Sequence, residues 1–98
     1  MKVTQPRLGG IAQSKQGRDK GKLYVICDIS GTSVMLADGV TKTKANPKCK
    51  NVKHVYLLNK TVAEYGVAYP WDNSFDCKAA YALKQIKAEL NPQIKSED

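Results

Sequence analysis

The segment that most constrains the fold is residues 14–22, SKQGRDKGK, because it separates two strand-like segments. It contains four cations, one carboxylate and two glycines. Gly17 and Gly21 can adopt positive φ, which permits a tight reversal of the chain and close backbone approach. The segment therefore predicts a hairpin loop that displays cations, and such a loop suits a phosphate backbone better than a metal ion. The alternative interpretation is a charged loop whose lysines only keep the protein soluble.

Five short strands are expected between residues 8 and 58. Residues 8–13 form the first strand, and residues 23–29 alternate in polarity with period two, as a strand with one buried face does. Residues 34–37 follow, and Asp38-Gly39 is typical of a two-residue hairpin turn. Residues 40–45 and 55–58 complete the set. This pattern predicts a small, strongly bent and tightly closed barrel, with a core of Ile11, Val25, Cys27, Ile29, Val34, Leu36, Val55 and Leu57.

The remainder of the chain is expected to be an appendage of the barrel. Residues 1–7 form a loose leader, residues 59–73 a connector, residues 74–91 a helix and residues 92–98 a frayed tail. Spacings of four, four, three and four place one apolar stripe on the helix, namely Phe75, Ala79, Leu83, Ile86 and Leu90. We expect this stripe to pack against the barrel or against a partner. The connector aromatics Tyr65, Tyr69 and Trp71 either stack on bases or hold the connector against the domain.

The basic charge is concentrated in the first part of the chain. Residues 1–60 carry twelve Lys and Arg against three Asp, a balance of +9, whereas residues 61–98 carry four Lys against six acidic residues, a balance of −2. This asymmetry indicates a domain that faces a polyanion. A second basic cluster, residues 48–54, adds Lys48, Lys50, Lys53 and His54 to the loop cations. Lys42 and Lys44 either protect an edge strand from unwanted pairing or contact RNA.

The sequence contains no combination of residues typical of an enzyme or a metal site. Its three cysteines are widely spaced, without a Cys-x-x-Cys pair, so they are expected to be reduced thiols in a cytoplasmic protein. We find no pairing of a nucleophile with a base, and no paired carboxylates with a plausible role. No apolar stretch is long enough to span a membrane, and no cofactor is expected.

The order of these motifs resembles a known family. Gly9-x-Ile11-Ala12-x-Ser14 followed by residues 17–22 and an alternating apolar run is similar to a KOW motif. The continuation through residues 36–39 and 46–55 resembles the bacterial KOW-domain RNA-binding proteins related to the archaeal and eukaryotic large-subunit ribosomal protein fourteen. The resemblance covers about residues 8–58, and it implies an SH3-like barrel that binds ribosomal or other structured RNA without catalysis.

By motif position, the resemblance implicates two loops in RNA binding. The first contributes Ser14, Arg18, Asp19, Lys20 and Lys22, and the second contributes Lys48, Lys50, Lys53 and His54. Charge alone adds Lys15, Lys42 and Lys44. We expect Arg18 to act as a bidentate phosphate fork and Asp19 to orient Arg18 or to accept backbone N–H groups. His54 is either an RNA contact or a structural residue.

The expected partners are therefore RNA and ribosomal proteins, with no membrane. The family is expected to have a more basic connector and tail than this chain has, which leaves the role of the helix open. The second function considered is a protein-interaction adaptor that uses the barrel or the helix. The two functions have different structural requirements. RNA binding requires both basic loops on one face, whereas a peptide groove requires a cluster of exposed aromatic side chains.

Overall fold

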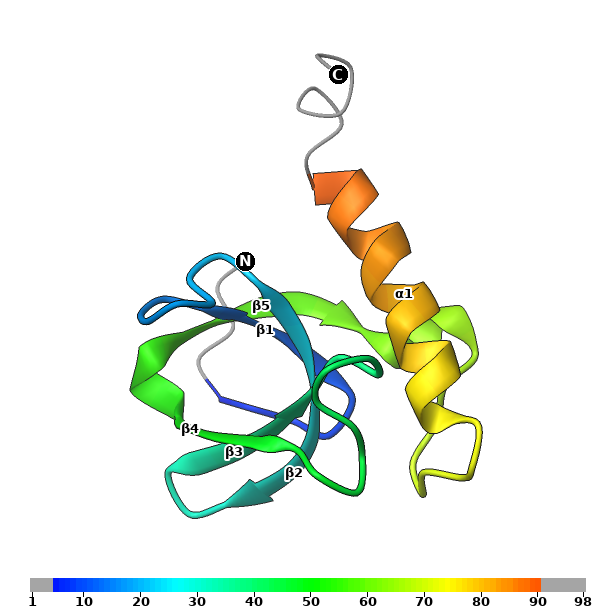
Figure 1. The fold of residues 1–98 in the computed structure, drawn as a ribbon, viewed down its shortest axis with the longest axis horizontal. Coiled ribbons are helices and arrows are strands. Elements are labelled where there is room, and N and C mark those ends of the chain that lie inside the picture. Colours follow the sequence, from blue (N-terminus) through cyan, green and yellow to red (C-terminus); the bar gives the residue numbers. More distant parts are fainter. Residues whose placement is uncertain (1–4, 91–98) are drawn as a thin grey trace.

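The protein is mainly β, with five antiparallel strands followed by one α-helix (Figure 1). The computed structural model describes residues 5–90. The strands are β1 (Gly10–Ser14), β2 (Leu23–Ser30), β3 (Ser33–Ala37), β4 (Lys48–Asn51) and β5 (Val55–Thr61). Two 3-10 helices, η1 (Val52–His54) and η2 (Val62–Tyr65), flank β5, and α1 spans Phe75–Leu90. The predicted class, a five-stranded mainly β chain with a C-terminal helix, is confirmed.

The sheet is strongly curved, but it is not closed. Its strand order is β4-β3-β2-β1-β5, which places β4 and β5 at opposite edges. The register shifts between Gly10 and Ile11 against β5 and between Ile26 and Asp28 against β3, and such irregularities bend a sheet. In the described part of the chain, η1 connects the two edges without a hydrogen-bonded ladder between them. The tightly closed barrel expected from the sequence is therefore not confirmed.

Strand β2 is buried on both faces, because the curved sheet has one core inside it and another outside it. Tyr24 and Ile26 point to the inner core, where Ala12, Val34, Leu36 and Val55 surround them. Leu23, Val25 and Cys27 point to the outer core, which α1 covers. The prediction that β2 has one buried face was therefore wrong for its first five residues, all of which are buried. Six of the eight predicted core residues are buried and divide between these two clusters, since Ile11 lies in the outer one and Val34 in the inner one. Ile29 and Leu57 are only partly buried against the inner one.

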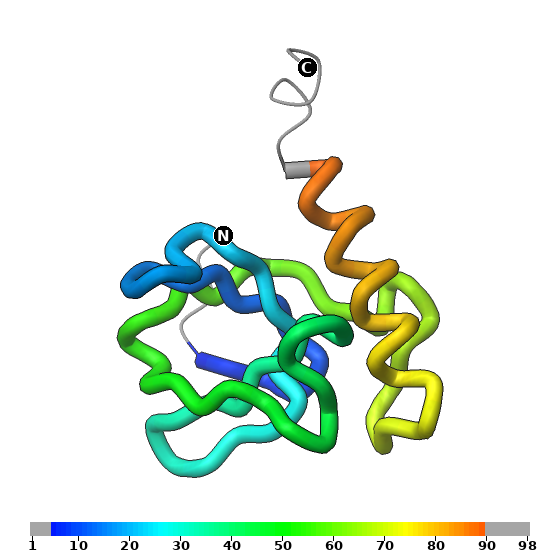
Figure 2. The backbone as a smooth tube through the Cα atoms, viewed as in Figure 1, coloured from blue at the N-terminus to red at the C-terminus, as the bar shows by residue number. Residues whose placement is uncertain are grey.

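The helix lies along the outside of the sheet, as Figure 2 shows, and its apolar stripe belongs to the outer core. Phe75, Ala79, Leu83 and Ile86 are buried there, which confirms the packing face, whereas the side chain of Leu90 lies outside the described part. Trp71 lies against Phe75, with ring centroids 4.7 Å apart, and its indole N–H donates to the Cys27 carbonyl at 2.8 Å. Trp71 therefore holds the connector against the domain.

The predicted fourth strand, residues 40–45, was wrong, because residues 38–47 form a long loop between β3 and β4. The Asp38 carboxylate accepts hydrogen bonds from the backbone N–H groups of Val40 and Lys42 and from the Thr41 hydroxyl, each at 2.8 Å. These bonds fold the loop back on itself, and the Lys44 N–H donates to Asp76 of α1. The two-residue hairpin turn is also wrong, since Gly39 has a φ of 80° while Asp38 does not have positive φ. The fourth strand is instead β4, inside the second basic cluster.

The other predicted boundaries shift by a few residues. Strand β5 extends to Thr61 and η2 follows it, so the irregular connector is shorter than predicted. Most of the predicted leader and the whole predicted tail lie outside the described residues. Between residues 5 and 90, no helix combines the length and apolarity needed to cross a membrane.

Candidate nucleic-acid interface

The loop between β1 and β2, residues 15–22, is a tight reversal that two glycines make possible. Gly17 and Gly21 both have a φ of 90°, as predicted from the need for positive φ at a tight turn. The Gly21 N–H donates to the Ser14 carbonyl at 2.8 Å, and the Ser14 N–H donates to the Lys22 carbonyl at 3.0 Å. The backbone therefore fixes the loop independently of its charged side chains.

Asp19 is the centre of a network that joins the two basic clusters. Its Oδ1 accepts from the Ser14 hydroxyl at 2.8 Å and from Lys50 Nζ at 3.1 Å. Its Oδ2 accepts from the Tyr24 hydroxyl at 2.7 Å and from Lys48 Nζ at 2.8 Å. Within residues 5–90, the hydrogen bonds of this carboxylate all come from side chains. The prediction that Asp19 orients Arg18 or accepts backbone N–H groups was therefore wrong.

The protonation states of this network follow from its contacts. Burial alone would raise the pKa of Asp19, but hydrogen bonds from Lys48, Tyr24, Ser14 and Lys50 outweigh burial and hold this pKa well below its ordinary value. Burial and the adjacent Asp19 carboxylate raise the pKa of Tyr24. Asp19 is therefore ionised and Tyr24 is neutral at physiological pH, so the carboxylate accepts from both lysines and from the Tyr24 hydroxyl.

Further contacts bring the second cluster against the first. Lys50 Nζ also donates to the Ser14 hydroxyl at 2.7 Å and to the Gln16 carbonyl at 3.0 Å. The Lys15 N–H donates to the His54 carbonyl at 2.9 Å, and Lys15 Nζ lies 4.7 Å from the centroid of the Tyr56 ring. The β1–β2 loop and residues 48–54 therefore share one surface, which we call the basic face. Its charged residues are Lys15, Arg18, Lys20, Lys48, Lys50, Lys53 and the single carboxylate Asp19, a balance of +5.

The predicted RNA-binding residues differ in their access to a ligand. Arg18, Lys20 and Lys53 are exposed, and none of the three forms an ion pair with another described residue. Ser14 is only 1% exposed, and its hydroxyl accepts a hydrogen bond from Lys50, so it positions that lysine rather than contacting a ligand. His54 is half-buried, and its carbonyl is used by Lys15.

The remaining predicted lysines, Lys22, Lys42 and Lys44, either contact the β3–β4 loop or lie in it. Lys22 forms a 2.6 Å ion pair with Asp38, the carboxylate that organises this loop. Burial alone would raise the pKa of Asp38, but the ion pair with Lys22 and the hydrogen bonds within the loop hold it well below its ordinary value. Lys42 and Lys44 are half-buried in the loop and do not lie on an edge strand, so the interpretation that they protect such a strand was wrong.

Tyr24 is a participant that the sequence did not reveal. In the strand expected over residues 23–29, Tyr24 lies on the face opposite the predicted core residues Val25 and Cys27. It is only 2% exposed, and its hydroxyl reaches Asp19 from the inner core. One signal for this contact was available in the sequence. Tyr24 lies at the start of the strand that follows a loop with a single carboxylate, and a buried tyrosine hydroxyl usually needs a hydrogen-bond partner.

The donors and the charge of the basic face suit an anionic ligand. Lysine ammonium groups and one guanidinium supply donors and positive charge. Within residues 5–90, no group of three or more His, Cys, Asp and Glu side chains is placed to hold a metal ion. Cys27, Cys49 and Cys77 are free thiols.

No protein-family model matches this chain, and no curated protein matches it either.

Proposed function

We propose that this protein binds structured RNA in the cytoplasm, in association with the ribosome or with translation, and does so without catalysing a reaction. The observation that carries the proposal is the union of the two basic clusters into one face with a balance of +5. A polyanion is the natural partner of such a face, because each phosphate contact releases condensed counterions. The resemblance of residues 8–58 to KOW-domain RNA-binding proteins supports the same function.

Contacts to phosphates and 2′-hydroxyls fit the basic face better than stacking on bases. Tyr24 is buried within the sheet, which leaves Tyr56, 56% exposed, as the aromatic side chain of this region. The ammonium of Lys15 lies over the Tyr56 ring, so a cation occupies one side of it. Proteins that bind single strands without sequence preference use several aromatic platforms. The proposed ligand is therefore a folded RNA whose shape and phosphates are recognised.

The alternative function, a protein-interaction adaptor, has less support from the fold. The apolar stripe of α1, which a protein partner would bind, is buried against β2. Trp71 is engaged with Phe75 and with the Cys27 carbonyl. An adaptor would therefore have to use a surface other than this stripe and Trp71.

Ultraviolet crosslinking in cells, followed by sequencing of the attached RNA, tests the proposal. We expect ribosomal RNA to predominate, and we expect Arg18→Glu to reduce the yield of crosslinked RNA several-fold. Lys78→Glu is the matched control, because it reverses one exposed cation on α1 away from the basic face. An equal RNA yield from all three proteins, or a yield no greater than that of an unrelated protein, would refute RNA binding through this face.

A further inference from the structure

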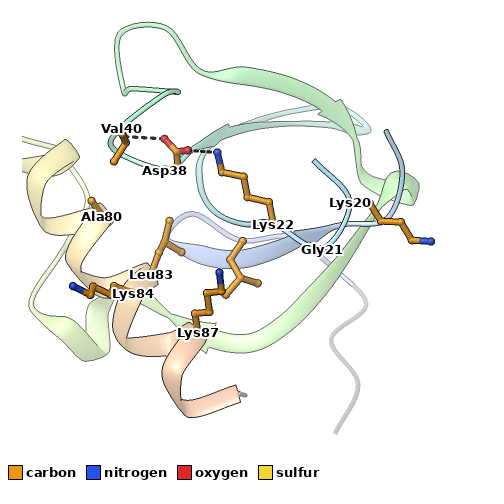
Figure 3. A pocket seen from close by; sticks show the side chains of 10 residues that line it. Lys20, Gly21, Lys22, Asp38, Val40, Ala80, Leu83, Lys84 and Lys87 are labelled. Atoms are coloured by element: carbon orange, nitrogen blue, oxygen red, sulfur yellow. Dashed lines mark hydrogen bonds and ion pairs between the residues drawn. The ribbon is translucent and has the colours of Figure 1, made fainter. Parts of the chain in front are cut away.

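A groove separates the β1–β2 loop and the β3–β4 loop from the second half of α1 (Figure 3). Its volume is about 600 Å³, within the range of pockets that hold small ligands. Its apolar lining is aliphatic and comes from Leu23, Val40, Ala80 and Leu83. Val40 is 72% exposed, so its side chain is accessible to a ligand in the groove.

Four lysines from two distant parts of the chain line the same groove. Lys20 and Lys22 come from the β1–β2 loop, and Lys84 and Lys87 come from α1. Lys22 is neutralised by Asp38 at 2.6 Å, so the groove has a balance of +3 from the other three lysines. In Figure 3 the Lys87 ammonium points into the groove, while Lys20 and Lys84 lie on opposite sides of it with their ammonium groups turned outward. One cation therefore lies inside the groove, and one exposed lysine flanks it on either side.

These lysines are more available to a ligand than several that the sequence favoured. Lys48 and Lys50 are occupied by Asp19, whereas Lys20, Lys84 and Lys87 are exposed and form no ion pair with any residue from 5 to 90. The spacing of three places Lys84 and Lys87 on one side of α1, and Ala80 lies one turn before Lys84.

We infer that this groove binds an unpaired segment at the end of the folded RNA through its sugar-phosphate backbone, with one phosphate at Lys87, neighbouring phosphates within reach of the flanking Lys20 and Lys84, and a ribose against the aliphatic floor. The inference rests on the proposed function and extends it, because it makes α1 part of the RNA-binding surface. A groove of this volume accommodates a nucleotide but not a duplex, whose A-form grooves are read from outside. Successive phosphates match one cation inside a groove with another on either side of it, whereas a single acidic group would contact only one of the three.

The experiment compares three charge reversals on one helix. The probe is a fluorescent hairpin RNA with a single-stranded tail, and the same hairpin without the tail is the second probe. Lys84→Glu and Lys87→Glu should each weaken binding of the tailed RNA roughly tenfold at about 50 mM salt, while Lys78→Glu should leave it nearly unchanged. Binding of the tailless hairpin should change much less. All three sites are exposed, so thermal melting should stay close to that of the wild type.

Val40→Glu tests the opposite wall of the groove. It places a carboxylate on the loop side, and it should also weaken binding of the tailed RNA if the strand lies between the two walls. If only the helix variants respond, the RNA lies outside the groove and the inference is wrong. If Lys84→Glu and Lys87→Glu bind both probes with the same affinity as Lys78→Glu, the groove does not bind RNA and the inference is wrong. An acidic protein partner then becomes the alternative ligand of the groove. Failure of the wild type to bind either hairpin would instead refute the proposed function itself.

Discussion

Asp19→Asn should lower the stability of the fold and raise its affinity for RNA. Asp19 accepts two hydrogen bonds from lysine ammonium groups and two from hydroxyls, so the amide removes the charge on which the whole network depends. The same substitution removes the only carboxylate of the basic face and frees Lys48 and Lys50. The backbone bond from Lys15 to His54 keeps the two clusters together in the variant.

The size of the stability loss follows from the exposure of the partners. Breaking a fully buried ion pair costs about 3–5 kcal/mol. The side chains of Asp19 and Lys50 are 12% and 13% exposed, but that of Lys48 is 34% exposed and can rehydrate. We therefore expect a loss of about 2–3 kcal/mol in the free energy of unfolding. For a domain of this size that corresponds to a fall of roughly 10–20 °C in the melting temperature.

Urea unfolding followed by the fluorescence of Trp71, the single tryptophan of the chain, measures the stability. Fluorescence anisotropy with a hairpin RNA, at a temperature where the variant is folded, measures the affinity, which should rise about two- to fivefold at low salt. Asp28→Asn is the matched control, since it removes one exposed carboxylate that forms no ion pair within the described residues. A folded Asp19→Asn protein that binds RNA more weakly than the Asp28→Asn protein would refute this reasoning.

Three further predictions concern a cation, two glycines and acid stability. Arg18→Ala should weaken RNA binding by about 1–3 kcal/mol with little change in melting, and Arg18→Lys should fall between it and the wild type, as titrations with one RNA would show. Gly39→Ala should destabilise the fold by more than about 3 kcal/mol, because the added methyl group clashes with the Asp76 carbonyl at a φ of 80°. Gly21→Ala, with a φ of 90° and open space around it, should cost only about 1 kcal/mol in the same melting experiment. The pKa of Asp19 is lower in the folded than in the unfolded protein, so its stabilisation is complete above about pH 4 and is lost as pH falls, by at most about 1.4 kcal/mol per pH unit. Unfolding free energies measured from pH 6 to pH 3 should therefore fall more steeply for the wild type than for Asp19→Asn.

Elements with a local cause were predictable from the sequence. The positive φ of Gly17 and Gly21 follows from the short loop that must reverse the chain between two strands. The buried stripe of α1 follows from the helical spacing of its apolar residues. The surface against which that stripe packs is not encoded by local sequence. Because α1 covers the outer face of the sheet, β2 is buried on both sides, and period two alone did not indicate this.

The errors in the loops and in the site have long-range causes. The alternation of threonine and lysine in residues 40–45 is compatible with a strand, but side-chain bonds to Asp38 and the contact from Lys44 to Asp76 hold a loop there instead. The two basic clusters were correctly recognised as basic. Their connection depends on Asp19 meeting lysines about thirty residues further along the chain, and no local pattern encodes that contact.

The salt dependence of RNA binding tests the central claim, recognition of phosphates by the basic face, most directly. With about five effective cations, the slope of log K against log salt should lie at roughly −3.5 to −4.5. The affinity of the full chain for a hairpin RNA should then fall by on the order of a hundredfold or more between about 50 and 200 mM salt. An affinity that stays constant across that range would contradict phosphate recognition by this face.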